Sequence, residues 1–89
     1  MPSISMFYGI IVYMYCMDSK QHNTPHIHVR CQGNEAVVAL PDGEVLEGEL
    51  PKNKMKLLQA WIELHQDELM ADWELALSGE HPYKIDPLR

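Results

Sequence analysis

The spacing of apolar residues changes once along this sequence, near Pro51, and this change restricts the folds open to the chain. Before Pro51, apolar residues fall in short runs and alternating patterns that are typical of β-strands. After it, they recur every three or four positions, as they do on one face of an α-helix. Strands therefore come first and helix last, and this order predicts an α+β fold in a single domain over residues 1–89.

Four strands are expected in the first half, joined as an antiparallel meander. The first is rich in Ile, Val, Tyr and Met and is apolar on both faces, as a central or doubly covered strand would be. Within it, Gly9 indicates a bulge or a close approach of another backbone. Pro41-Asp42-Gly43 predicts a hairpin, because glycine adopts the positive φ that such turns need. The expected strands span about residues 4–16, 26–31, 35–40 and 44–50.

The second half predicts one long helix over about residues 52–78, packed on one face of the sheet. Pro51 suits its first turn, and Gly79 is a natural stop. A straight helix of this length would span roughly 40 Å, so a break near Gln66, with Asp67 capping a second segment, stays an alternative. The apolar stripe consists of Met55, Leu58, Ile62, His65, Leu69, Trp73 and Ala76. The sheet residues expected beneath it are Ile10, Val12, Ile27, Val29, Val38 and Leu46.

The sequence is acidic, with a formal net charge of −6. This charge repels phosphate backbones and no basic stripe is present, so direct nucleic-acid binding is disfavoured. A basic protein partner would instead be attracted. A chain of 89 residues buries only about 60–65% of its unfolded surface. A protein partner or a homo-oligomer is therefore expected to add stability.

Cysteine usage and hydropathy predict a cytoplasmic protein. Cys16 and Cys31 are too few to staple a secreted scaffold, so free thiols in a reducing compartment are expected. The apolar run over residues 6–16 is shorter than the about 20 residues that a membrane span needs. It also lacks the flanking basic residues and cleavage site of a signal peptide.

The segment HNTPHIHV, residues 22–29, places three histidines within seven positions. His26 and His28 are two apart on an expected strand, so both rings should point outward from the core. His22, in the preceding turn, could fold over that face and complete a site for a divalent transition metal such as Zn²⁺, Ni²⁺ or Fe²⁺. Glu47 and Glu49 are expected on the same outer face, as a ligand or a general base.

Other interpretations of these histidines stay open. A histidine beside a proline turn often hydrogen-bonds a backbone carbonyl group and stiffens the turn, and a His-x-His pair can bind metal adventitiously. The same face could also recognise a protein partner. Glu35 and Asp18 are further candidate carboxylates. No G-x-S-x-G, glycine-rich phosphate loop or H-E-x-x-H occurs, so whether the chain is an enzyme stays open.

The stretches SMFYGIIVYMY, HNTPHIHV, GEVLEGELP and WIELHQDEL occur in this order along the chain. Together they resemble a bacterial family known as domain of unknown function 4160, over about residues 4–88. That family often has Asp before the first histidine and two prolines after it, where this chain has Gln21 and Thr24. The most specific part of the resemblance is the set His22, Pro25, His26 and His28.

The resemblance implies a small stand-alone protein with a protein partner. Members are often encoded beside another small protein, an arrangement similar to toxin–antitoxin-like pairs, and the inference to this chain is by analogy. The acidic charge and the lack of a complete catalytic constellation likewise favour a cytoplasmic interaction module. The alternative is a metal-dependent hydrolase or nuclease using His22, His26 and His28. Metal sensing or storage without turnover is a third hypothesis.

Overall fold

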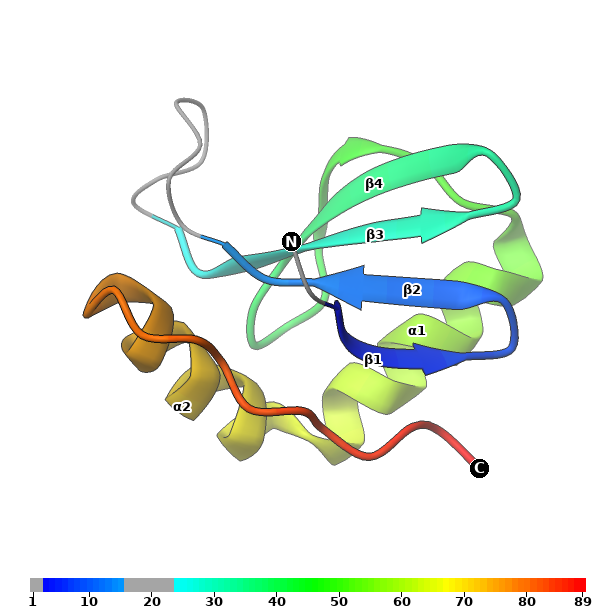
Figure 1. Cartoon of the computed structure of the whole chain (residues 1–89). Coiled ribbons are helices and arrows are strands. Elements are labelled where there is room, and N and C mark those ends of the chain that lie inside the picture. The colour runs from blue at the N-terminus through cyan, green and yellow to red at the C-terminus, as the bar shows by residue number, and fades with distance from the viewer. Residues whose placement is uncertain (1–2, 16–23) are drawn as a thin grey trace.

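The computed structural model describes residues 3–15 and 24–89. In these residues five strands form one antiparallel sheet, and each strand pairs with the next along the chain. Two helices follow, and both lie on the same side of the sheet (Figure 1). The α+β class and the meander are therefore confirmed. The elements are β1 (Ser3–Phe7), β2 (Ile10–Tyr13), β3 (His26–Cys31), β4 (Asn34–Ala39), β5 (Val45–Gly48), α1 (Lys52–Leu64) and α2 (Gln66–Leu77).

The expected single strand over residues 4–16 is wrong, because residues 3–13 form a hairpin of β1 and β2. Tyr8 and Gly9 make the turn, with φ angles of 50° and 80°, and Phe7 pairs with Ile10 across it. A two-residue loop with positive φ at both positions matches the twist of the flanking strands. Asparagine or aspartate usually precedes the glycine in such a turn. Because Tyr8 stands there instead, the sequence pattern did not predict the turn. The sheet therefore has five strands instead of about four.

The expected single helix over residues 52–78 is also wrong, since His65 separates α1 from α2 with φ −123° and ψ 27°. The molecule measures 33 × 27 × 23 Å, so a straight helix of roughly 40 Å would extend past the sheet. The bend keeps Leu69 and Trp73 in the core. It falls just before Gln66, and Asp67 lies in the first turn of α2 instead of capping it. Neither helix of the described chain has the length and apolarity needed to cross a membrane.

The core lies between the sheet and the two helices. Alternate residues of β2, β3 and β4 point toward the helices and are almost fully buried, as the period-two pattern predicts. Leu46 differs, because it is only half-buried, and the register of β4 and β5 shifts beside it. Cys31 is buried as a free thiol, while Cys16 lies outside the described residues. The central side chains are Ile10, Val12, Ile27, Val29, Val38, Leu58, Trp61, Ile62 and Leu69.

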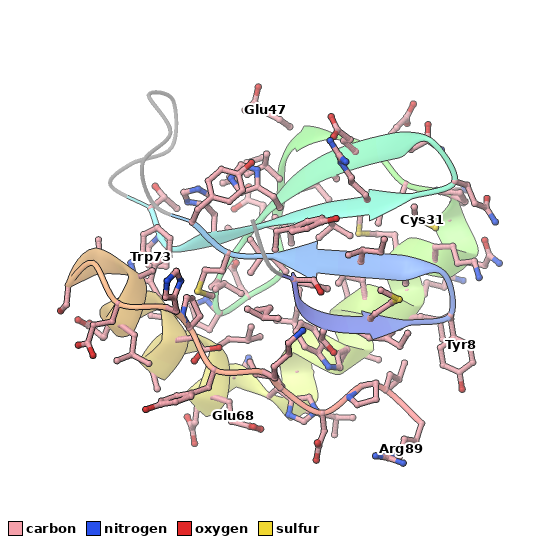
Figure 2. The ribbon with its side chains drawn as sticks, in the orientation of Figure 1. Tyr8, Cys31, Glu47, Glu68, Trp73 and Arg89 are labelled. Atoms are coloured by element: carbon pink, nitrogen blue, oxygen red, sulfur yellow. The ribbon has the colours of Figure 1, made fainter. Side chains whose placement is uncertain are left out.

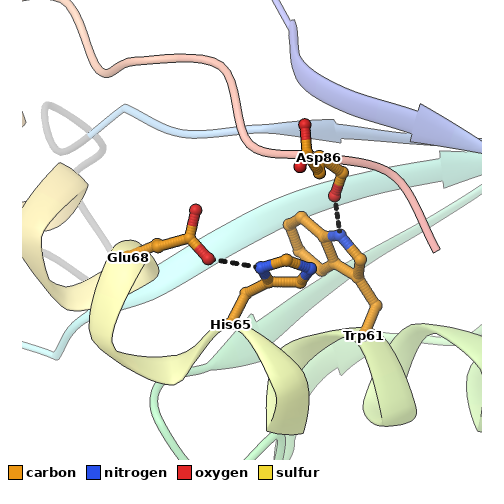
Figure 3. Close-up of polar contacts among 4 residues, drawn as sticks. All are labelled: Trp61, His65, Glu68 and Asp86. Carbon is orange, nitrogen blue, oxygen red and sulfur yellow. Dashed lines mark hydrogen bonds and ion pairs between the residues drawn. The ribbon is translucent and has the colours of Figure 1, made fainter.

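The C-terminal segment after α2 lies against the domain without forming a strand. The indole Nε1–H of Trp61 donates to the carbonyl oxygen of Asp86 at 2.8 Å (Figure 3). The N–H of Ile85 donates to the carbonyl oxygen of Ile4 in β1 at 2.8 Å, and Ile85 is buried. The segment therefore packs beside β1 at one edge of the sheet, while β5 forms the other edge.

Candidate functional site

One face of the sheet is turned away from both helices, and we call it the outer face. Strand pairing places Tyr13 opposite His28, His28 opposite Val37, and Val37 opposite Glu47. Directly paired residues of adjacent strands lie on the same face. These four residues therefore form one row that crosses β2, β3, β4 and β5. The outer face is defined by this row together with Ile11, Tyr15, Arg30 and Glu35.

A hollow with a volume of about 600 Å³ opens on the outer face. Its size falls in the range of ordinary small-ligand sites, and its lining mixes aromatic and charged side chains. Figure 2 shows Glu47 projecting away from the helices. The lining residues come from four strands and the segment after β2, and they are Tyr13, Tyr15, His28, Arg30, Glu35, Ala36, Val37, Glu47 and Gly48.

The imidazole of His28 is held by two other rings. The ring of Tyr15 stacks on it with centroids 3.9 Å apart and an interplanar angle of 9°. The ring of His26 meets it at 71°, with centroids 5.1 Å apart. Rings packed in this way lose rotational freedom, so the His28 ring has a fixed orientation in the hollow.

Arg30 is the positively charged side chain that lines the hollow, and two neighbouring side chains hold it there. Its Nε–H donates to Oε1 of Glu35 at 2.7 Å, and its guanidinium carbon lies 5.9 Å from the centroid of the Tyr13 ring. The hydrogen bond and the charge of Glu35 raise the pKa of Arg30 above its ordinary value. This pair is exposed, so it orients the two side chains more than it stabilises the fold.

The structure places His26 differently from the sequence-based expectation. Its ring does share a face of β3 with His28, but it is 0% exposed. The ring of Trp73 in α2 covers it, with centroids 5.0 Å apart, and Figure 2 shows Trp73 near the start of β3. Nδ1–H of His26 donates to the carbonyl oxygen of Thr24 at 2.5 Å. These contacts match the interpretation in which a histidine stiffens the turn.

The structure brings together only part of the predicted metal set. His28 and Glu47 line the same hollow, whereas Glu49 is exposed and does not line it. Gly48, with a φ of 72°, lies between the two glutamates and interrupts the alternation of faces. His22 lies outside the described residues. Within residues 3–15 and 24–89, no group of three or more His, Cys, Asp or Glu side chains is arranged to hold a metal ion.

The sequence pattern did not identify the tyrosines of the hollow. Alternation from the expected core residues Ile10 and Val12 does place Tyr13 on the opposite face, but no pattern marked either tyrosine as part of a hollow.

Arg30 opposes Glu35 because the loop between β3 and β4 is only Gln32 and Gly33, with Cys31 opposite Asn34. The three-residue turn expected from the sequence would have placed Cys31 opposite Glu35 and would have missed this pair.

Comparisons with known proteins identify the family of the chain. A comparison with curated proteins and one with solved structures both gave no match. The model of one protein family matches residues 9–74, which is most of the chain and includes all three histidines of the HNTPHIHV segment. The chain therefore belongs to the family described as domain of unknown function (DUF4160).

Proposed function

We propose that this protein is a protein-interaction module and that the outer face is its binding surface. The observation that carries the proposal is the hollow of about 600 Å³ on the sheet face turned away from the helices, where only the end at His26 is covered, by Trp73. Tyrosine and arginine, which line it, are the residues that most often dominate binding energy at protein interfaces. The stacked Tyr15 and His28 rings add a rigid anchor, because they have little side-chain entropy left to lose.

The partner in this proposal is the product of the adjacent gene, as half of a toxin–antitoxin-like pair. The resemblance described above supports this choice, because family members are often encoded beside another small protein. The net charge of −6 is compatible with a partner of opposite charge. We place the pair in the cytoplasm, and cell fractionation showing the protein elsewhere would refute that location.

Calorimetry with the purified adjacent gene product tests the proposal. We expect the full chain to bind it, and Tyr13→Ala to weaken binding at least about tenfold, as loss of an aromatic anchor does. Tyr83→Ala is the matched control, because Tyr83 is 74% exposed on the C-terminal segment and its side chain should be dispensable. Thermal unfolding must show that both variants stay folded. Absence of a complex, or equal affinity of Tyr13→Ala and wild type, would refute the proposal.

A metal-dependent hydrolase or nuclease is the second candidate. Its support is that His28 and Glu47 share one hollow and one cross-strand row, with the His26 ring next to His28. An imidazole and a carboxylate are suitable ligands for Zn²⁺ or Fe²⁺. Metal analysis of untagged protein, purified without added metal, tests this candidate. Metal in a one-to-one ratio that is lost in His28→Ala would favour it, and substoichiometric metal in both proteins would exclude it.

A further inference from the structure

The two edges of the sheet are protected in different ways. At β5 the protection is charge, because Glu44, Glu47 and Glu49 lie in this strand or beside it, and charged side chains on an edge disfavour a further strand. The edge at β1 has the sequence SISMF, without a charged side chain. It is flanked instead by the C-terminal segment, residues 80–89, which we call the cover (Figure 1). The β1 edge thus depends on a neighbouring segment, and not on charge, to keep other strands away.

The backbone of β1 presents hydrogen-bonding groups at this edge that the cover does not use. Phe7 pairs across the two-residue turn, and the pair that closes such a turn exchanges hydrogen bonds. The next pair, Met6 with Ile11, does not, so the N–H and C=O of Met6 point away from β2 and toward the edge. In residues 3–15 and 24–89, one backbone hydrogen bond joins the cover to β1, from the N–H of Ile85 to the carbonyl oxygen of Ile4, and Met6 forms none with it.

The cover fits this edge only in part. Pro82 and Pro87 have no N–H, so neither can extend a β-ladder as a donor. A hollow of about 340 Å³ lies where residues 3–6 of β1 meet residues 84–87 of the cover. Ser5 is among its lining residues, and the buried Ser5 hydroxyl has no hydrogen-bond partner within the described chain. A regular strand at this edge would form more backbone hydrogen bonds than the cover does.

We propose that the cover is displaceable and that β1, once uncovered, pairs with β1 of a second copy of this chain. The occupant is a second copy because β1 is uncharged in a chain with a formal net charge of −6, so two acidic copies meet here with little local repulsion. A two-fold axis makes the two strands antiparallel, and each Met6 offers the same N–H and C=O to its counterpart. Because the β5 edges stay acidic, pairing stops at a dimer.

This dimer contact is separate from the outer-face hollow, since no lining residue of that hollow belongs to β1 or to the cover. The inference therefore goes beyond the proposed function. In this arrangement the cover is an autoinhibitory contact: it hydrogen-bonds the same edge that a second copy would pair with, so the two exclude each other.

Releasing the cover within the 89-residue chain tests the inference. Ile85 is the buried residue of the cover whose N–H bonds β1, so Ile85→Asp places a charge in an apolar site and favours the uncovered state. The indole N–H signal of Trp61 in NMR spectra reports release, because its acceptor is the carbonyl oxygen of Asp86. Light scattering should show a dimer whose dissociation constant is at least about tenfold below that of wild type, since affinity rises with the fraction of uncovered chains.

Hydrogen exchange at the amide of Met6 shows whether β1 forms the contact. This N–H points to the edge in the wild-type chain and should exchange readily there. Pairing with a second β1 should slow its exchange at least about tenfold in the Ile85→Asp dimer.

Two lysine variants, made in the Ile85→Asp chain, separate β1 pairing from general association. Met6 and Leu64 are both exposed apolar residues, at 60% and 69%, and Leu64 lies at the end of α1, away from β1. Met6→Lys places a charge on the β1 edge and should restore the monomer. Leu64→Lys adds the same charge and should leave the dimer intact.

Several outcomes would overturn the inference. They are a folded Ile85→Asp chain that stays monomeric, a dimer in which the Met6 amide exchanges as in wild type, and equal effects of the two lysine variants. If Ile85→Asp does not fold, Ile85→Ala replaces it, because that change removes packing without adding a charge. Ile85→Ala should self-associate more tightly than wild type, and equal self-association of the two would overturn the inference as well.

Discussion

Replacing Gly48 by alanine should destabilise the protein more than the same change at its other left-handed glycines. Gly48 ends β5 with a φ of 72°, a conformation that residues with a Cβ atom rarely adopt. An added Cβ would overlap the carbonyl oxygen of Glu35 and would lie 3.0 Å from the Glu35 carbonyl carbon and 3.1 Å from Cα of Ala36. These are backbone atoms of β4, so no side-chain rotation can relieve the overlap.

The expected loss has two parts. A non-glycine residue in the left-handed region costs about 1–2 kcal/mol, and overpacking against immobile neighbours costs about 1–3 kcal/mol. Gly48→Ala should therefore lower the free energy of unfolding by about 2–5 kcal/mol. Domains of this size have only about 5–15 kcal/mol in total. Since Glu47 adjoins Gly48 and lines the hollow, the displaced strand should also weaken binding at the outer face.

Gly33→Ala is the matched control. Gly33 has a φ of 81°, and a Cβ built there meets nothing within 4 Å, so only the conformational part of the cost applies. We expect a loss of about 1–2 kcal/mol for this variant. Urea unfolding followed by the fluorescence of the buried Trp61 and Trp73 measures both losses. Equal losses for Gly33→Ala and Gly48→Ala would refute the steric argument, because they would mean that β4 and β5 separate freely.

Three further predictions follow from individual side chains. Tyr8→Asn should raise the free energy of unfolding by about 0.5–1 kcal/mol in urea titrations, because asparagine accepts the positive φ of this turn more readily; no gain would contradict the turn assignment. His26→Ala should lower the free energy of unfolding by about 2–4 kcal/mol, since a fully buried ring and its hydrogen bond to Thr24 are lost. A loss below about 1 kcal/mol would contradict a structural role for the His26 ring. Burial, opposed by the N–H of Tyr83 and aided by Glu68, raises the pKa of Asp72. The stabilisation linked to Asp72 is therefore full below its unfolded pKa and is lost as pH rises through the raised folded value. Asp72→Asn, which keeps an acceptor for Tyr83, should gain stability relative to wild type as pH rises, and a constant difference across pH would contradict the raised pKa.

Sequence patterns were most reliable where one physical effect decides the structure. The bounds of β3 were predicted correctly, because Ile27, Val29 and Cys31 alternate with polar residues and are buried as that alternation requires. The β1–β2 turn was missed, since its backbone needs positive φ at a tyrosine. The sequence left undecided whether the helix bends near His65, because helical periodicity continues through that position. The bend is set by the size of the molecule, since a straight helix would extend past the sheet.

The burial of His26 shows why the site could be predicted only in part. Alternation fixes the face of β3 on which a side chain lies, and that prediction was sound for His26 and His28. Alternation does not determine which side chains cover that face. Trp73 covers the end of the face at His26. The position of Trp73 depends on the bend between α1 and α2, which no local pattern near His26 encodes.

The two described histidines of the HNTPHIHV segment consequently have different chemical roles. Nδ1–H of His26 donates to the carbonyl oxygen of Thr24, so that nitrogen carries a proton and only Nε2 of this ring could bind a metal. The ring is also packed against Trp73, so using it as a ligand would require a loss of core packing. His28, by contrast, lines the open hollow, and its orientation is fixed by Tyr15 on one side and by His26 on another. The buried ring of His26 thus packs against the ring that faces the hollow, and the two described histidines are not equivalent in exposure.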